Sequence, residues 1–303
     1  MTHSRRKHLQ LLSSLAAAPL FSSFKSFSTD SMITRATSAG EQIPVIGLGT
    51  WQTFDVNSNP DSTNPLKEVL TILTSKGGKV IDSSPMYGRS EKVVGDLSTE
   101  LNLNSKFFMA TKVWTSGKDQ GINQMNESFR LLQRKQVDLM QIHNLVDWQT
   151  HLPTLRAWKE QGKIRYIGIT HYTESAYSSI EQILKTQQLD FLQINYSLLS
   201  RKAEERLFPL AQEKKVSVLI NRPYEEGELF NRVKGKTLPN WANEFDCMSW
   251  GQFFLKFIIS HPAVTCAIPG TSKPHHMVDN AGAGFGKLPN VDHRKKMIQL
   301  VEG

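Results

Sequence analysis

Four side chains at separated positions could together transfer a proton to or from an oxygen atom. Asp82 and Tyr87 lie in the stretch 80–91, which reads Val-Ile-Asp-Ser-Ser-Pro-Met-Tyr-Gly-Arg-Ser-Glu. Lys112 and His143 each end a later apolar run. A phenol has a reference pKa of about 10, and a neighbouring ammonium lowers that pKa because it stabilises the phenolate. An aspartate can hold such a lysine, and a histidine can orient the reacting oxygen. The set predicts acid–base chemistry with Tyr87 as the acid or base.

Eight short apolar runs must position these side chains. They are mostly continuous rather than alternating, which is typical of parallel strands buried on both faces. The runs cover residues 45–51, 79–82, 107–112, 137–143, 164–170, 191–195, 216–221 and 263–269. Apolar residues in the segments between them have helical spacing. One of these helices is expected to begin at Asn64-Pro65 and to stop at Gly77-Gly78.

Strands that alternate with helices predict an α/β fold, a (β/α)8 TIM barrel in one domain over residues 31–303. A doubly wound sheet is the alternative, but Gly47-Leu-Gly49 lacks the third glycine of G-x-G-x-x-G. The C-terminal ends of barrel strands share one mouth, so the four polar side chains are expected to meet there. Taken singly, they have plainer explanations: a turn cap, a solvated lysine and a structural histidine.

The longest connection runs from residue 222 to residue 248. Loops of this length are usually functional or mobile, and Tyr224 and Trp241 within it are expected to close over the mouth. Trp51 and Trp114 follow strands that lead to the same mouth. They either wall a substrate pocket or pack in the core, and the sequence leaves both interpretations open.

Residues 1–30 resemble a targeting segment rather than part of the fold. The first 29 residues contain no Asp or Glu, and a basic start with Arg5-Arg6 precedes a short apolar stretch, 9–21. This pattern is typical of a twin-arginine export signal, which would place the protein in the periplasm and engage export machinery. A transit peptide for an organelle and a disordered basic tail on a cytoplasmic protein are the alternatives.

The composition favours a soluble globular protein. The net charge is +8, but Lys and Arg are scattered rather than gathered in a stripe with aromatic residues, so we expect no nucleic-acid partner. No apolar run is long enough for stable membrane insertion. Cys247 and Cys266 stand alone, without the spacing of a metal site, and we expect no metal.

The motifs resemble those of the aldo/keto reductase family. Asp82 and Tyr87 match its D-x-x-x-x-Y-G-x-S-E signature, and Lys112 and His143 match its lysine and histidine positions, over a resemblance that spans roughly residues 40–290. The resemblance implies a (β/α)8 barrel that reduces an aldehyde or ketone with a nicotinamide cofactor. It also implies that Tyr87 protonates the oxygen, assisted by Lys112 and Asp82, while His143 orients the carbonyl.

The same resemblance implies the cofactor contacts. Near the nicotinamide it indicates Gly49, Thr50, Trp51, Thr170, His171, Gln193 and Tyr196. At the nucleotide end it indicates Gly270, Thr271, Ser272, Lys273, His276, Asp279 and Asn280. Family members strict for NADPH often carry lysine and arginine at the positions of Gly270 and His276. This chain has neither, but Thr271, Ser272 and Lys273 are candidates to hold a 2′-phosphate, so NADPH is expected, with NADH possible.

Two functions from different classes remain at this point. The first is an NADPH-dependent carbonyl reductase, expected to be a monomer that acts on a small molecule. The second is a nicotinamide-binding barrel that serves as a regulatory or interaction module with little turnover. The complete set of four side chains favours the enzyme.

Overall fold

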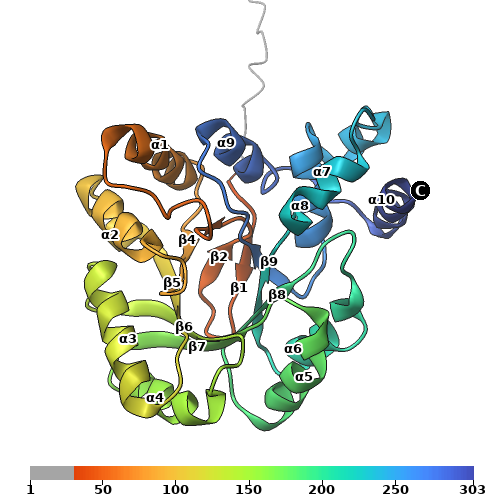
Figure 1. Ribbon diagram of the computed structural model, residues 1–303. Coiled ribbons are helices and arrows are strands. Elements are labelled where there is room, and N and C mark those ends of the chain that lie inside the picture. The colour runs from red at the N-terminus through yellow and green to blue at the C-terminus, as the bar shows by residue number, and fades with distance from the viewer. Residues whose placement is uncertain (1–30) are drawn as a thin grey trace, which may run out of the picture.

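The computed structural model describes residues 31–303 as a barrel of eight parallel strands surrounded by helices (Figure 1). The strands follow one another in sequence order. They are β3 (Leu48–Gly49), β4 (Val80–Asp82), β5 (Phe108–Val113), β6 (Val137–His143), β7 (Ile164–Thr170), β8 (Phe191–Asn195), β9 (Ser217–Asn221) and β10 (Val264–Ala267). The predicted (β/α)8 barrel is confirmed. The targeting segment predicted at residues 1–30 lies outside the described residues.

The first and last strands close the barrel through a close backbone seam. The amide of Gly47 donates to the Ala267 carbonyl at 2.9 Å, and the amide of Gly49 donates to the Pro269 carbonyl at 3.2 Å. A Cβ atom on Gly49 would lie 2.8 Å from the Ile268 carbonyl oxygen. Glycine is therefore needed at this position because the two backbones approach too closely for a side chain.

Ten α-helices within residues 31–303 cover the barrel and its rims. They are α1 (Pro60–Ser75), α2 (Ser90–Glu100), α3 (Lys118–Leu131), α4 (Trp148–Glu160), α5 (Tyr177–Thr186), α6 (Leu207–Glu213), α7 (Glu228–Arg232), α8 (Trp250–Ile259), α9 (Pro274–Gly282) and α10 (Val291–Glu302). None of these helices combines the length and apolarity needed to cross a membrane.

The start predicted for α1 is wrong, although its end is confirmed. The helix begins at Pro60 after Asn59, whose side chain accepts a hydrogen bond from the Ser62 amide at 2.9 Å. Asn59-Pro60 has the same capping chemistry as Asn64-Pro65, so the sequence offers two starts one turn and a half apart. The extra turn buries only Thr63, whose hydroxyl donates to the Asn59 carbonyl at 3.0 Å. It stops before Gly77, which has a φ of +84°.

An antiparallel hairpin precedes the barrel and was not predicted. It pairs β1 (Thr34–Ala36) with β2 (Gln42–Pro44) and crosses the middle of the ring in Figure 1. Glu41, just before β2, forms ion pairs with Lys79 at 3.0 Å and with Arg165 at 2.6 Å. Because these partners stand where β4 and β7 begin, the hairpin closes the end of the barrel opposite the mouth.

The long connection after β9 is ordered as short helices rather than open loop. It contains the 3-10 helices η4 (Glu225–Gly227) and η5 (Asn240–Phe245) with α7 between them. The backbone turns sharply at its start, since Arg222, Glu225 and Glu226 all have positive φ. This turn brings the segment across the mouth of the barrel. Trp241 does not close over the mouth, because its ring packs on Phe245, Phe253 and His293.

Candidate active site

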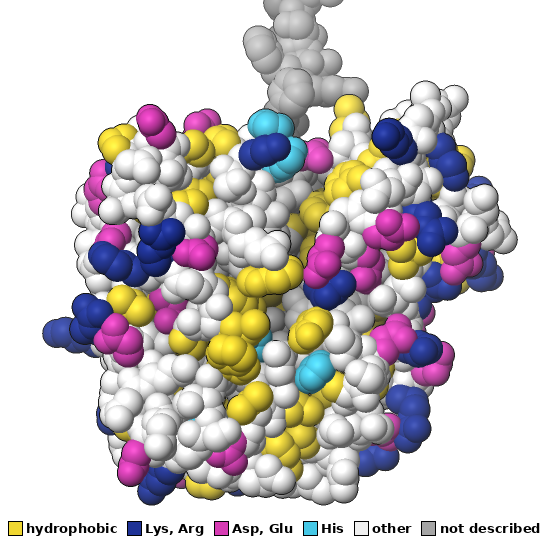
Figure 2. All heavy atoms as spheres, viewed as in Figure 1, with side chains coloured by type: hydrophobic (Ala, Val, Ile, Leu, Met, Phe, Trp, Pro, Cys, Tyr) yellow, Lys and Arg dark blue, Asp and Glu magenta, His cyan; other side chains and the backbone are white. Residues whose placement is uncertain are grey.

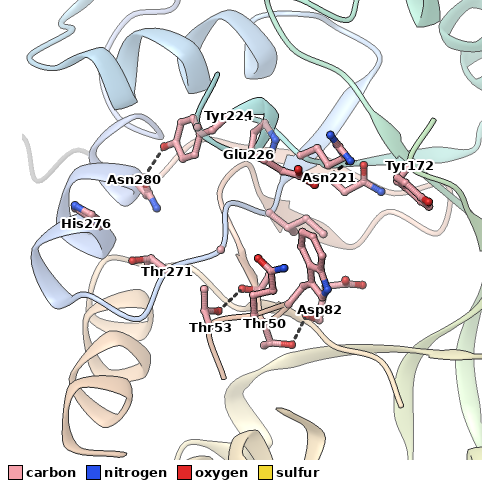
Figure 3. Close-up of a pocket in the computed structure, with 18 of the residues that line it drawn as sticks. Thr50, Thr53, Asp82, Tyr172, Asn221, Tyr224, Glu226, Thr271, His276 and Asn280 are labelled. Carbon is pink, nitrogen blue, oxygen red and sulfur yellow. Dashed lines mark hydrogen bonds and ion pairs between the residues drawn. The ribbon is translucent and has the colours of Figure 1, made fainter. Parts of the chain in front are cut away.

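A cleft of about 970 Å³ opens at the C-terminal ends of the strands. Its volume is at the upper end of the range of about 300–1,000 Å³ that is usual for small-molecule sites. Figure 2 shows hydrophobic side chains gathered around a hollow near the middle of this face. Figure 3 shows polar side chains from strand ends and from α9 pointing into the cleft. Chemistry in this fold is located at this face.

Asp82 and Lys112 form a fully buried ion pair at the base of the cleft. Asp82 ends β4, and Lys112 lies on the neighbouring strand β5. The Lys112 ammonium donates to Asp82 Oδ2 at 2.6 Å and to the Ser83 carbonyl at 2.6 Å. The other carboxylate oxygen, Oδ1, accepts from Gln141 at 2.9 Å and from Gln193 at 2.8 Å. Every carboxylate oxygen therefore has a donor, as a buried charge requires.

The Tyr87 side chain lines the cleft beside this ion pair. Its ring centroid is 4.8 Å from the Lys112 ammonium. Burial lowers the pKa of Lys112, but Asp82 and Tyr87 raise it further, so its pKa lies above the ordinary value and the amine stays charged. The ammonium was predicted to lower the pKa of Tyr87. In this geometry burial raises the pKa of Tyr87 more than Lys112 lowers it, so the phenol remains protonated at neutral pH.

His143 completes the group from the end of β6. Its ring stands edge-on to the Tyr87 ring, with the centroids 5.8 Å apart and the planes at 86°. Burial, assisted by Lys112 and His171, lowers the pKa of His143 to about 3. The imidazole is therefore neutral at physiological pH, and a neutral imidazole carries one donor and one acceptor nitrogen. Trp114 lies beside it, with the ring centroids 6.3 Å apart.

The structure thus brings the four predicted side chains together. Asp82, Tyr87 and His143 line the cleft, and Lys112 lies directly behind them with no exposed surface. Trp114 is 40% exposed beside His143 rather than buried in the core, and Trp51 is 42% exposed in the lining. Trp51 therefore belongs to the rim of the cleft, whereas Trp114 stands beside His143 outside the lining.

Most of the predicted cofactor residues line the same cleft. These are Gly49, Thr50, Trp51, Thr170, Gln193, Gly270, Thr271, His276, Asp279 and Asn280. Four others are absent from the lining: His171, Tyr196, Ser272 and Lys273. The cleft is thus continuous from the strand ends around Tyr87 to the start of α9.

Tyr196 lies on the opposite side of the strand from the cleft, which corrects its predicted stacking role. It continues the outward-facing positions of β8 after Ile194, because side chains alternate along a strand, whereas Gln193 faces inward. The Tyr196 ring is fully buried against Phe208 and Phe257. Its hydroxyl is bonded to Glu204 and Arg294.

Three other predicted positions differ in detail. The His171 ring turns back to its own loop, where Nδ1 accepts from the Tyr172 amide at 3.0 Å, and the ring stacks on Tyr172. Tyr172 lines the cleft in its place. Lys273 is the N-cap residue of α9, and its amide donates to Thr271 Oγ1 at 3.0 Å. Thr271, rather than Ser272 or Lys273, faces the cleft.

Several lining residues were missed by sequence reasoning. They include Thr53, Met86, Asn144, Asn221, Arg222, Glu226, Phe230, Ser249 and Trp250. Asn221 ends β9 and could have been found by the strand-end rule that identified His143. Tyr224, expected over the mouth, does line the cleft, where its hydroxyl donates to Asn280 Oδ1 at 2.6 Å (Figure 3). The remaining residues come from turns whose direction depends on the tertiary structure.

The chain matches the model of the aldo/keto reductase family over residues 45–295. This match covers most of the sequence, and the chain therefore belongs to the aldo/keto reductase family, which confirms the resemblance read from its motifs.

Characterised relatives and solved structures agree with this assignment. The chain is 29% identical over 248 residues to methylglyoxal reductase YeaE of Escherichia coli, covering 79% of this chain and 84% of that protein. It is 28% identical to an NADH-specific methylglyoxal reductase of the same organism, covering 65% and 68%. It is similar in fold to an aldo/keto reductase of Klebsiella pneumoniae in complex with NADP and acetate, with a TM-score of 0.72, 24% identity and coverage of 88% and 94%.

Proposed function

We propose that this protein is a carbonyl reductase that uses a nicotinamide cofactor and has Tyr87 as its proton donor. The observation that carries the proposal is the arrangement of Asp82, Lys112, Tyr87 and His143 at one end of the cleft. A protonated phenol and a neutral imidazole both face the same space, and a buried ammonium lies behind the phenol. This arrangement suits proton donation to a carbonyl oxygen.

The residues of the cleft fit a dinucleotide. Four glycines line it, Gly49, Gly227, Gly251 and Gly270, so a ligand can approach the backbone closely. The Asn221 carboxamide oxygen, next to Gln193, is buried without a hydrogen-bond partner among the described residues. Thr170, Gln193 and Asn221 would hold the nicotinamide end, and Thr271, His276 and Asn280 would hold the adenosine end. When bound there, the cofactor supplies the hydride that reduces the carbonyl carbon.

The side chains of this protein account for the remaining steps. Tyr87 would donate its hydroxyl proton to the carbonyl oxygen as the alkoxide forms. The Lys112 ammonium would stabilise the phenolate that remains, and Asp82 holds Lys112 in place through the 2.6 Å contact. His143, which stays neutral, would hydrogen-bond the same oxygen and orient it. After the reaction, a proton from solvent restores Tyr87.

The preferred substrates are carbonyl compounds with an apolar substituent. Trp51, Met86, Trp114 and Tyr172 are each between 40% and 45% exposed around the mouth. Exposed aromatic groups of this kind provide apolar surface for a substrate to cover. The two relatives named methylglyoxal reductase act on a small dicarbonyl, so methylglyoxal belongs in the test panel beside larger aldehydes and quinones.

NADPH is the proposed cofactor, with NADH accepted. Support comes from the complexes of Klebsiella pneumoniae aldo/keto reductases with NADP and NADPH, while the relative described as NADH-specific keeps NADH open. Thr271 and His276 line the nucleotide end. Binding of each cofactor, followed by protein fluorescence, measures the preference directly.

The decisive experiment is NADPH oxidation by the purified protein with the carbonyl panel, beside Tyr87→Phe. Turnover that falls at least about 100-fold in Tyr87→Phe, with cofactor binding unchanged, supports the reductase, because general acid catalysis contributes about 10²–10⁴-fold. Tight cofactor binding without turnover of any carbonyl would favour the regulatory module. Failure to bind either cofactor would contradict both functions.

We also propose export of the folded protein through the twin-arginine pathway and action as a monomer. The export proposal rests on the basic start and apolar stretch within residues 1–30. Cell fractionation of the full chain and of a variant with Arg5→Lys and Arg6→Lys tests it. Loss of periplasmic protein in the variant is the expected outcome, and cytoplasmic location of both chains contradicts it. Sedimentation of the purified protein tests the monomer.

A further inference from the structure

Ser84 has a contact that the proposed reaction does not yet use. It lies between Asp82 and Tyr87 in the signature stretch and is fully buried. Its hydroxyl oxygen is 3.1 Å from Nδ1 of His143. Ser84 itself does not line the cleft. It therefore touches the reaction only through the imidazole, on the side of the ring that faces the protein.

The hydrogen bonds around Ser84 decide which nitrogen of His143 carries the proton. A hydroxyl has one proton and two lone pairs. One lone pair of Ser84 accepts from the Met86 amide at 3.2 Å. Among the described residues, the only acceptor within reach of the hydroxyl proton is Nδ1 of His143.

The opposite arrangement leaves a buried donor unsatisfied. If Nδ1 carried the proton and donated to Ser84, the hydroxyl proton would have no acceptor, and buried donors without partners are strongly disfavoured. The favoured arrangement has Nδ1 as acceptor. Because the ring is neutral, its proton must then be on Nε2.

Nε2 is the nitrogen that is free to meet a substrate. It makes no hydrogen bond with any residue in the range 31–303. It is also not one of the fully buried polar atoms that lack a partner in that range, so it is accessible from the cleft. With its proton, Nε2 can donate to a carbonyl oxygen. Without it, Nε2 would present a lone pair to that oxygen, and the two would repel.

We propose that Ser84 is a positioning residue that holds His143 with its proton on Nε2, so that the imidazole donates to the carbonyl oxygen. The proposal rests on the proposed carbonyl reductase for its consequence. The tautomer of His143 itself does not depend on turnover and can be measured without it. Partners that fix the ring proton of metal-bound histidines typically change affinity or activity about 10- to 100-fold when they are removed, and we expect an effect of the same order here.

The first measurement is the NMR spectrum of the full chain labelled with ¹⁵N-histidine, with His143→Gln used to assign the His143 signals. Protonated and unprotonated ring nitrogens have distinct ¹⁵N chemical shifts. The wild-type protein should show Nε2 protonated and Nδ1 unprotonated. A proton on Nδ1 in the wild-type protein would overturn the proposal whether or not any carbonyl is reduced, so its failure is distinguishable from failure of the reductase.

The second measurement compares Ser84→Ala with Ser98→Ala. Ser98 on α2 is an equally buried serine with two hydrogen bonds, remote from the cleft. Ser84→Ala should populate the other tautomer and lower kcat/KM about 10- to 100-fold, with cofactor affinity unchanged. Ser98→Ala should leave the His143 tautomer and kcat/KM unchanged. A Ser84→Ala protein with the wild-type tautomer and wild-type kcat/KM contradicts the proposal. If Ser84→Ala does not fold, Ser84→Cys replaces it, since the weaker thiol donor should shift the tautomer in the same direction.

Discussion

The Lys112 ammonium lies over the Tyr87 ring, 4.8 Å from its centroid, and simultaneously donates to Asp82 at 2.6 Å. The Asp82 carboxylate thus holds the Lys112 ammonium in place beside the Tyr87 phenol. Burial keeps the Tyr87 hydroxyl protonated, and in the proposed reaction the ammonium would stabilise the phenolate that remains after proton transfer.

Replacement of Lys112 by Met should destabilise the fold as well as abolish turnover. The substitution leaves the Asp82 carboxylate buried without its cation, and such a change typically costs about 3–5 kcal/mol of unfolding free energy. Urea denaturation measures the loss. The double variant Lys112→Met with Asp82→Asn removes both charges and should recover part of it. A single Lys112→Met variant as stable as wild type would show that the ion pair contributes little.

Reduction should proceed over a wide pH range and weaken only in strong alkali. The pKa of Tyr87 is raised above its ordinary value of about 10 by burial. The proton donor is therefore present below that pKa and is lost as the pH rises through it. An absorbance titration of phenolate in wild type and Tyr87→Phe locates the transition. A Tyr87 phenolate at neutral pH in the free protein would contradict the expectation.

Folding stability should fall in acid because of His143. Its pKa is about 3 in the folded protein and about 6.5 in an unfolded chain. The unfolded state binds the extra proton first, so stability is complete above pH 6.5 and decreases as the pH falls toward 3. This group contributes a slope of up to about 1.4 kcal/mol per pH unit.

Urea denaturation at pH 7, 6 and 5 measures this dependence. His143→Gln should lose stability less steeply than wild type over the same range. Equal slopes in the two proteins would mean that the pKa of His143 is the same in the folded and unfolded states, which contradicts the lowered folded-state pKa. His171, His261 and His276 also have lowered pKa values, so part of the dependence will remain in the variant.

The aromatic rim should favour longer aldehydes. Each methylene that a straight-chain aldehyde buries on the rim contributes about 0.8 kcal/mol, so kcat/KM should rise up to about fourfold per added carbon until the rim is covered. Tyr172→Ala should flatten this series, because Tyr172 lines the cleft and is 45% exposed. Met248→Ala, which removes another exposed apolar side chain outside the cleft lining, is the control. If kcat/KM of the wild-type protein did not change with aldehyde length, the rim would not contribute to substrate binding.

The seam of the barrel should not tolerate a side chain at residue 49. In Gly49→Ala the new Cβ would lie 2.8 Å from a backbone oxygen, that of Ile268. Such overpacking typically costs about 1–3 kcal/mol, and the upper end is expected because backbone atoms cannot rotate away. Gly162→Ala, in open space with a φ of +72°, should cost only the roughly 1–2 kcal/mol of a left-handed residue. Thermal unfolding of the two variants compares them, and equal stability would contradict the close seam.

The strand-end rule explains why so much of the site could be predicted. Asp82, Lys112 and His143 are polar residues that terminate apolar runs, and parallel strands bring such positions together whatever the lengths of the helices between them. The same rule covers Asn221, which was overlooked only because no motif drew attention to it. The fold and the placement of the central side chains therefore follow from local patterns in this chain.

Other features depend on information that local patterns do not contain. Tyr196 lies one residue past the end of β8, so its direction depends on where the strand stops. The hairpin strands β1 and β2 are three residues each, too short for an alternating pattern to be recognised. The pKa of Tyr87 depends on the balance of burial against Lys112, and that balance needs the packing of the whole mouth.

The seam between β3 and β10 has a consequence for synthesis on the ribosome. More than two hundred residues separate Gly49 from Pro269, yet their backbones are hydrogen-bonded. Until the last strand has left the exit tunnel, the growing sheet has two unpaired edges, and such edges can pair with those of another nascent chain. Closure of the barrel therefore comes late in synthesis, and chaperones that shield sheet edges should affect the yield of this protein more than its final stability.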